Sequence, residues 1–440
     1  MRVLMLSWEY PPRSIGGLST HVYNISHSLQ RAGHEIHVVT CGNEKSKAFE
    51  IEDGINIHRV FPISIEKDNL IEWINQLNYA MIEASAKLLN TDEKFDLIHA
   101  HDWHVAFAAK TLKQIYCLPL ITTFHSTEYG RNNGIYTDLH KHIASIEALL
   151  AKESSKIICC SEYMKDQVSS LYDIDKNNIQ VIPNGVFEAP KSSGRINMFR
   201  RAYAKDDEKI VLFIGRHIYL KGIHHLIDAI PTVVSKIDNI KFIISGTGPM
   251  TEDLKYKAQA MGISDKIIFT GYLDEKVKQK LYRAADVFVI PSLYEPFGNV
   301  VLEAMTMGCP VVASATGGLS EIVDNNVTGK LFNPGYVHEL ADSIVELLND
   351  DVLRNSIIEK ALDVVKDSYT WEKASELTSE AYISLRIKKK RTPVRKNNKK
   401  PVVEEKELFN TEDINEKSSE RKKSSRNGKK KVENDMSELL

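Results

Sequence analysis

The sequence has little of several features that would place it in a special class of proteins. It contains five cysteines in 440 residues, and none of them forms a CxxC pair or a spacing typical of zinc ligands. An odd number of cysteines in apolar surroundings is typical of a reducing compartment, so we expect a cytoplasmic location. No apolar run approaches the ~18 residues that a membrane span needs. The apolar run at the N-terminus is also too short for a signal peptide.

The formal net charge is also small, but it is unevenly distributed. Residues 386–440 carry 18 Lys/Arg against 10 Asp/Glu, whereas residues 1–385 carry 39 against 49. A polar, basic segment with little apolar surface to bury does not form a core, so we expect a disordered tail over residues 388–440. Such a tail can contact an anionic membrane surface. Its single aromatic residue, Phe409, and its interleaved acidic residues argue against nucleic-acid binding.

What the chain does have is a repeated alternation of short apolar runs and amphipathic segments. This pattern predicts α/β architecture with parallel sheets. It breaks at a polar stretch over residues 187–195, which predicts two doubly wound, Rossmann-like domains at 1–186 and 196–370 joined by a linker. Residues 371–387 are predicted to form a last helix.

Two glutamates flank a turn and the start of a helix in the segment PSLYEPFGNVVLEAMTMGCPVVASA. Glu295 precedes the turn formed by Pro296, Phe297 and Gly298, and Glu303 lies eight residues further on. Eight helical residues span roughly 12 Å, about the length of a nucleotide sugar. The pair could therefore contact both ends of such a ligand, or it could simply cap and solvate a helix.

The other polar clusters also follow predicted strands. Arg216 and Lys221 lie between a strand and a helix, where two cations and a helix N-terminus can bind a diphosphate. A glycine loop at Gly246 follows the next strand, and Gly16-Gly17 follows the first strand of the chain. Because ligands bind at the carboxyl ends of parallel strands, these clusters predict a site in a cleft between the two domains.

A histidine-rich segment, HAHDWH, ends another predicted strand of the first domain. Its histidines and Asp102 could hold a metal, but His99 and His101 share one strand face and no cysteine completes a ligand set. We favour a hydrogen-bonding wall with a stacking aromatic residue, Trp103, and expect no metal. His125 ends the following strand and is either a structural or a site residue.

Together, the two glutamates, the Arg216–Lys221 pair, the glycine loops and His125 resemble the retaining glycosyltransferases of family 4. The resemblance covers residues 1–385 and implies the GT-B fold, two facing Rossmann-like domains with a cleft between them. Within that family, HAHDWH and the EYPP…GGL opening are similar to short archaeal and bacterial glycogen and starch synthases.

The resemblance also implies roles for individual residues. Catalytic roles fall on His125 near the anomeric carbon, on Arg216 and Lys221 at the donor diphosphate, and on Glu295 at the donor hexose. The other implied contacts are donor-binding (Gly17, Gly246, Phe297, Gly298, Asn299, Glu303) or acceptor-side (His101, Asp102, Trp103). No metal and no cofactor are implied, because the two cations take the place of a metal. The last helix is expected to pack back onto the first domain.

We therefore expect transfer of a hexose, with glucose as the favoured sugar, from a nucleoside diphosphate sugar to an α-glucan or oligosaccharide, with retention of configuration. The loop from Ser14 to Thr20 lacks the Lys and Asp usual in bacterial glycogen synthases that use ADP-glucose, so ADP, UDP and GDP all stay open. The alternative in the same family is a mannosyl, glucosyl or N-acetylglucosaminyl transferase acting on a lipid-linked or cell-envelope glycan. A non-catalytic sugar-nucleotide-binding protein is the third reading.

Overall fold

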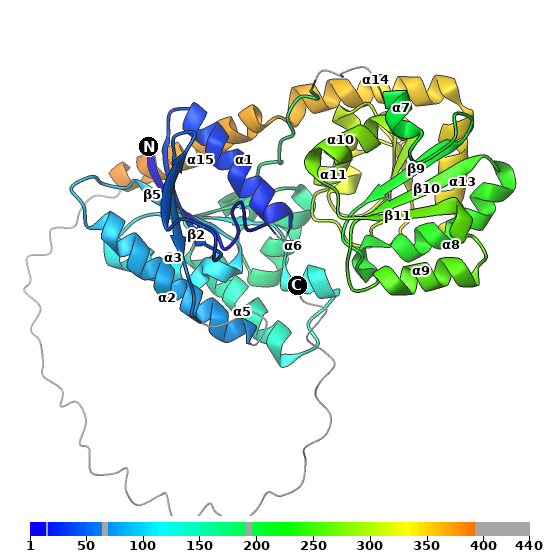
Figure 1. The fold of residues 1–440 in the computed structure, drawn as a ribbon. Helices are drawn as coiled ribbons and strands as arrows, with labels where there is room; N and C mark the ends of the chain where they lie inside the picture. Colours follow the sequence, from blue (N-terminus) through cyan, green and yellow to red (C-terminus); the bar gives the residue numbers. More distant parts are fainter. Residues whose placement is uncertain (15, 64–68, 191–195, 392–440) are drawn as a thin grey trace, which may run out of the picture. The chain divides into compact units, whose positions relative to one another are not determined.

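The computed structural model describes residues 1–14, 16–63, 69–190 and 196–391. Residues 1–386 form one compact unit that contains two separate β-sheets (Figure 1). Helices alternate with strands along the described chain, so the predicted α/β architecture is confirmed. Most of the tail predicted for residues 388–440 lies outside the described residues.

The first sheet runs in the order β3-β4-β2-β1-β5-β6-β7-β8. Its strands are β1 (Arg2–Leu6), β2 (Glu35–Cys41), β3 (Phe49–Glu52), β4 (Ile55–Val60), β5 (Leu97–His101), β6 (Leu120–Phe124), β7 (Lys156–Cys159) and β8 (Ile179–Val181). Neighbouring strands are parallel, with Val3 opposite Ile36 and Leu97, except that β3 is antiparallel to β4. The β3–β4 hairpin was not predicted. It turns at Asp53-Gly54, where both residues have positive φ, the signature of a tight Asp-Gly hairpin turn.

Helices cover both faces of this sheet. They are α1 (Gly17–Arg31), α2 (Leu70–Leu89), α3 (Ala106–Tyr116), α4 (Glu128–Asn132), α5 (Asp138–Glu153), α6 (Glu162–Tyr172) and the 3-10 turns η1 (Trp103–Val105) and η2 (Lys176–Asn178). α2 packs on α3 and α3 on α5 on one side of the sheet, while α1 lies on the other (Figure 1). Polar caps fix the starts of several helices: the side chain of Asn69, for example, accepts a hydrogen bond from the backbone N–H of Glu72.

The second sheet is entirely parallel, in the order β11-β10-β9-β12-β13-β14. Its strands are β9 (Lys209–Ile214), β10 (Ile240–Ser245), β11 (Ile267–Gly271), β12 (Val287–Ile290), β13 (Val311–Ser314) and β14 (Lys330–Phe332). Its four central strands, β10, β9, β12 and β13, consist mostly of buried apolar residues, as expected for strands covered on both faces, whereas only the first residue of the edge strand β11 is buried.

Two groups of helices cover this second sheet. The elements are α7 (Ile196–Arg200), α8 (Ile223–Lys236), α9 (Thr251–Ala260), α10 (Glu275–Ala284), α11 (Asn299–Thr306), α12 (Leu319–Ile322), α13 (Val337–Asn349), α14 (Asp351–Ser368), η3 (Tyr219–Lys221) and η4 (Ser264–Lys266). α8 packs against α9 and α13 on one face, and α10 packs against α7 and α11 on the other (Figure 1).

The last helix, α15 (Trp371–Arg391), returns to the first sheet. Next to its start, the backbone of Val186 donates a hydrogen bond to the carbonyl of Tyr369, so the two chain segments that connect the sheets touch here. Further along, the Tyr382 hydroxyl lies 2.7 Å from His99 Nδ1, and both residues are fully or almost fully buried. The helix thus packs on the first domain, as the resemblance implied.

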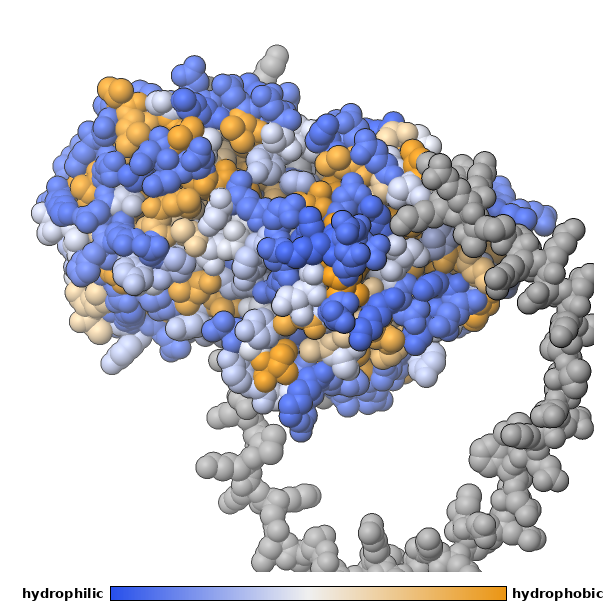
Figure 2. All heavy atoms as spheres, turned by 180° about the vertical axis from the view of Figure 1, so that it is seen from behind, coloured by the Kyte–Doolittle hydropathy of each residue, from blue (hydrophilic) through white to orange (hydrophobic). Residues whose placement is uncertain are grey.

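On the face of the molecule shown in Figure 2, apolar side chains lie in small groups between polar ones. Among the described residues, no helix is both long and apolar enough to cross a membrane. All five cysteines are free thiols, and four of them are buried.

We predict that Tyr382→Phe destabilises the protein by about 1–3 kcal/mol, because it leaves a buried nitrogen of His99 without its partner. Denaturant unfolding measures this loss. The matched control is Tyr256→Phe, which removes a hydroxyl from a side chain that is 74% exposed and should be neutral. Equal effects of the two substitutions would show that the Tyr382–His99 contact does not hold α15 in place.

Candidate active site

The residues singled out in the second half of the sequence gather at the carboxyl edge of the second sheet. Arg216 and Lys221 follow β9, and Gly246 follows β10. The loop with Glu295, Phe297 and Gly298 follows β12 and leads into α11, which Asn299 begins. The structure therefore places these residues on one edge of one sheet, as the sequence predicted.

The loop between β12 and α11 (residues 291–298) is held by close backbone contacts. A Cβ atom on Gly222 would lie 1.9 Å from the carbonyl oxygen of Pro291, and one on Gly317 would lie 2.1 Å from that of Glu295. Both glycines have positive φ, so a side chain is excluded by conformation as well as by space. The backbone N–H of Leu293 donates to Leu220 at 2.7 Å. The loop is thus fixed against the segment that carries Lys221.

This fixation brings two predicted catalytic residues into direct contact. Lys221 Nζ lies 2.7 Å from Glu295 Oε2, and the Ser292 hydroxyl donates to the same oxygen at 3.2 Å. Glu295 is 8% exposed and Lys221 is half-buried. Partial burial strengthens the attraction relative to a surface ion pair. The pair presents a positioned ammonium group at the mouth of the site.

Arg216 precedes Lys221 in the same loop after β9 and interacts with Glu9 of the first half of the molecule. Burial lowers the pKa of its guanidinium, and the negative charge of Glu9 opposes this shift. Glu9 is buried and also accepts a hydrogen bond from the backbone N–H of Gly16 at 3.2 Å. A carboxylate from the first glycine loop therefore acts on a predicted diphosphate-binding cation.

Glu303 is tied to a neighbouring helix. It accepts hydrogen bonds from Lys278 and from the Tyr282 hydroxyl, at 3.1 and 3.0 Å, both on α10. Burial raises the pKa of Glu303, and the charge of Lys278 opposes that effect. Its predicted contact with ribose hydroxyls stays a prediction, and Lys278 is a neighbour that the sequence analysis did not single out.

The two halves meet around Asn299. A Cβ on Gly17 would lie 3.3 Å from its amide nitrogen, so the first glycine loop lies against the start of α11. The amide of Asn184 donates to Asn299 Oδ1 at 2.9 Å and contacts His21 Nδ1 at 2.8 Å with its own oxygen. Sequence reasoning missed His21 and Asn184, because neither lies in a distinctive motif. Only the fold brings α1 and the segment after β8 to this point.

His101 and His125 lie next to each other at the ends of β5 and β6. His101 Nδ1 is 3.2 Å from His125 Nε2, and the Asp102 carboxylate accepts from the backbone N–H of His125 at 2.7 Å. Burial lowers the pKa of His125 to about 3 and raises that of Asp102 to about 6. His101 and His125 are therefore neutral at pH 7 and act as hydrogen-bonding groups there.

Trp103 has a different environment from these neighbours. It is 3% exposed, and its ring stacks on that of His104 at 4.2 Å. His104 in turn stacks on Trp8. In this arrangement Trp103 contributes packing, and its contact with a saccharide stays a prediction.

Tyr294, which the sequence analysis did not single out, links the two halves. Its hydroxyl donates to Gln167 Oε1 at 3.1 Å, and a Cβ on Gly130 would lie only 2.1 Å from that hydroxyl. Gly130 lies on α4, directly after the segment that carries His125. Because Tyr294 is the neighbour of Glu295 in the chain, it connects the Glu295–Lys221 pair to the His125 segment.

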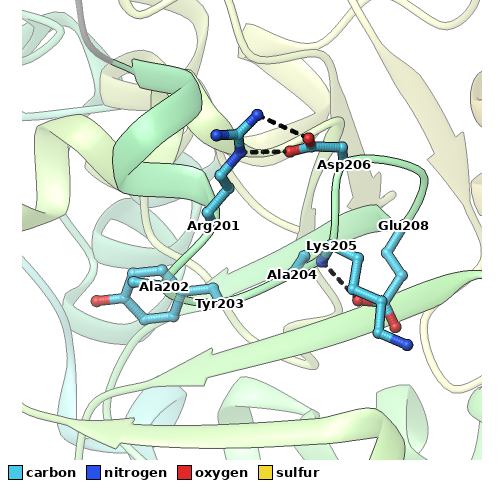
Figure 3. A pocket seen from close by; sticks show the side chains of 7 residues that line it. All are labelled: Arg201, Ala202, Tyr203, Ala204, Lys205, Asp206 and Glu208. Atoms are coloured by element: carbon cyan, nitrogen blue, oxygen red, sulfur yellow. Dashed lines mark hydrogen bonds and ion pairs between the residues drawn. The ribbon is translucent and has the colours of Figure 1, made fainter.

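One surface depression among the described residues lies away from this arrangement. It has a volume of about 470 Å³ and is lined by residues 201–206 and Glu208, with an exposed Arg201–Asp206 ion pair at its rim (Figure 3). These residues precede β9 and so lie at the amino edge of the second sheet. Exposed ion pairs contribute little free energy, and nothing here resembles the polar cluster at the opposite edge.

Comparison with known proteins agrees with this geometry. Residues 15–188 match the family model "Glycosyltransferase Family 4", and residues 195–364 match "Glycosyl transferases group 1". A glycosyltransferase of Methanocaldococcus jannaschii is 38% identical over 87% of this chain and 98% of its own length. The chain belongs to glycosyltransferase family 4. A glycogen synthase of Mycobacterium tuberculosis is 33% identical to this transferase, over 87% of this chain and 95% of its own.

Solved structures agree on the fold of the transferase. A sucrose-phosphate synthase from Thermosynechococcus elongatus has a TM-score of 0.76 at 22% identity, covering 88% of this chain and 99% of its own. HepE from Anabaena, solved with UDP and glucose, has a TM-score of 0.71 at 21% identity over 87% and 99% of the two chains. The catalytic domain of starch synthase IV from Arabidopsis thaliana, bound to ADP and acarbose, has a TM-score of 0.70 at 17% identity over 87% and 98%. The predicted GT-B fold is confirmed.

We predict that Gly130→Ala lowers the stability of the transferase by about 1–3 kcal/mol, because the new methyl group overlaps the Tyr294 hydroxyl. In a Tyr294→Ala background the space is free and the same substitution should be nearly neutral. Thermal unfolding of the four proteins of this double-mutant cycle measures the coupling. An identical cost of Gly130→Ala in both backgrounds would rule out the contact.

Proposed function

We propose that this glycosyltransferase moves glucose from a nucleoside diphosphate glucose to an α-glucan or maltooligosaccharide, with retention of configuration and without a metal ion or cofactor. The observation that carries the proposal is the Lys221–Glu295 pair, fixed at 2.7 Å at the sheet edge that also carries Arg216 and the glycine loop at Gly246. The similarity to a glycogen synthase over nearly the whole of both chains supports glucose and glucan. The UDP, glucose and ADP bound to structural neighbours support a nucleotide-sugar donor.

In the proposed reaction, departure of the nucleoside diphosphate is the demanding step. Negative charge develops on the phosphate oxygen as the bond to the anomeric carbon breaks. Lys221 and Arg216 are positioned to stabilise that charge, and Glu295 holds the Lys221 ammonium in place before the donor arrives. Preorganised charges need little rearrangement at the moment of reaction, which is why a fixed ion pair suits this role.

The neutral histidines serve the sugar end of the same donor. Because burial keeps His125 and His101 uncharged, they offer hydrogen bonds without placing a positive charge beside an oxocarbenium-like anomeric carbon. Asp102 fixes the backbone of His125 at 2.7 Å and so sets its distance to the sugar. The acceptor hydroxyl would approach from this side, in a reaction that is either a same-face displacement or a double displacement.

The decisive experiment measures nucleoside diphosphate release from ADP-, UDP- and GDP-glucose and from GDP-mannose and UDP-N-acetylglucosamine, each with and without maltooligosaccharides. We expect glucan-dependent release from one glucose donor and a product that an α-specific glucosidase degrades. Release that glucan does not stimulate would contradict the α-glucan acceptor. It would favour a lipid-linked or cell-envelope glycan, which the basic tail makes the second candidate.

We predict that Lys221→Ala lowers turnover by at least about 100-fold, because it removes the charge that stabilises the leaving group. Donor binding should weaken less than turnover falls. Lys255→Ala, which removes an exposed lysine from α9, is the matched control and should leave turnover unchanged. A Lys221→Ala enzyme with near-normal turnover and an intact fold would refute the assigned diphosphate site.

A further inference from the structure

Three imidazole rings from separate parts of the first half converge at one point. His21 lies on α1, His101 ends β5 and His125 follows β6, and one ring nitrogen of each lies within 4.8 Å of the other two. His21 and His101 are buried, whereas His125 is half-buried and gives the cluster its opening. A group of three histidines is an established donor set for zinc, which leaves a fourth position open.

The hydrogen bonds around His21 orient it as a ligand. Its Nδ1 is 2.8 Å from Asn184 Oδ1, and the amide nitrogen of Asn184 donates to Asn299. Because an amide oxygen only accepts hydrogen bonds, His21 Nδ1 carries the proton and Nε2 carries a lone pair. A ligating histidine characteristically donates its other N–H to such an oxygen, which fixes the ring and raises its basicity.

The His101–His125 pair already has the spacing of two ligands on one ion. Their facing nitrogens are 3.2 Å apart, close to the ~3.3 Å expected for two nitrogens at about 2.0–2.1 Å from a tetrahedral zinc. Without an ion, two neutral rings share a single N–H···N hydrogen bond.

The neighbouring His99 does not belong to this set. Both of its nitrogens have partners, Tyr382 through Nδ1 and Thr123 through Nε2, at 2.7 and 2.8 Å. His99 is thus structural, and of the histidines in the HAHDWH motif only His101 belongs to the converging set. His21 supplies the third ligand, 80 residues earlier in the chain than His101.

We propose that His21, His101 and His125 bind one divalent transition-metal ion of the zinc class. Imidazole nitrogens suit Zn²⁺, Cu²⁺ and Ni²⁺, whereas Mg²⁺ and Ca²⁺ prefer oxygen ligands.

Metal at this point has a consequence for transfer. If the proposed function holds, His125 lines the sugar end of the donor site, so a bound ion occupies space that the donor hexose needs. Zinc would then act as an inhibitor that competes with the nucleotide sugar, in contrast to a metal cofactor. Inhibition by zinc rests on the proposed function, whereas metal binding itself does not.

The binding test uses the full chain without a histidine tag, in buffer free of chelators and nucleotides. We titrate Zn²⁺ against a chromophoric chelator and record the visible absorption of the Co²⁺-substituted protein. We expect one ion per chain and the absorption pattern of a tetrahedral site. His21→Ala should abolish both signals, whereas His58→Ala, which removes a histidine of the separate His37–His58 pair, should change neither.

A second variant guards against misfolding of His21→Ala. Asn184→Ala keeps all three ligands but removes the oxygen that orients His21, together with the hydrogen bond to Asn299, so its zinc affinity should fall by about 10–100-fold. The proposed site is overturned if the wild-type protein binds no zinc. It is also overturned if wild type, His21→Ala and Asn184→Ala bind zinc with equal affinity.

The inhibition test adds zinc to the nucleoside diphosphate release assay. We expect zinc to inhibit transfer and rising donor concentration to relieve the inhibition. The control His58→Ala should show this competition between zinc and donor, whereas His21→Ala should not. If one zinc ion binds per chain without affecting transfer, only the proposed inhibition is overturned. A protein that binds zinc but transfers no sugar contradicts the proposed function and leaves the metal site standing.

Discussion

The loop between β12 and α11 is the element on which the geometry of the site depends. Backbone of neighbouring segments lies against it at Gly222 and Gly317, where no side chain fits, and Leu220 accepts its N–H groups. A loop packed on its backbone atoms has little freedom to move. Glu295 therefore holds Lys221 at a set distance, and Tyr294, one residue earlier, is directed into the other half of the molecule.

Burial decides the chemistry on the opposite side. The rings of His101 and His125 lie where a positive charge would be poorly solvated, so their pKa values fall and they stay neutral. The same burial raises the pKa of Asp102, which keeps its place by accepting a backbone hydrogen bond from His125. The second half thus presents fixed charge and the first half presents neutral hydrogen-bonding groups. This division suits a ligand with an anionic diphosphate at one end and a neutral sugar at the other.

A few residues make contacts that join the two halves of the molecule. Asn299 touches the first glycine loop through Gly17 and receives a hydrogen bond from Asn184, which also orients His21. The negative charge of Glu9 also acts on Arg216, where it opposes the lowering of the guanidinium pKa by burial. Asn299 in the second half and His21 in the histidine cluster are therefore joined through two hydrogen bonds of Asn184. The proposed metal site and the proposed transfer site share these residues, so binding at one site should affect binding at the other.

The sequence by itself determined the fold class and half of the site. Alternating apolar runs and helical periods predicted two parallel sheets, and the rule that ligands gather at strand carboxyl ends placed Lys221 and Glu295 on one edge. The local sequence also contains the signal for the β3–β4 hairpin, because Asp53-Gly54 is a typical tight hairpin turn. Only the tertiary structure decided which distant residues meet: Gly130 under Tyr294, Lys278 at Glu303, and His21 beside His101 and His125. Such contacts depend on how helices cross the sheets. No spacing in the chain encodes that crossing, because it is set by packing between elements far apart in sequence.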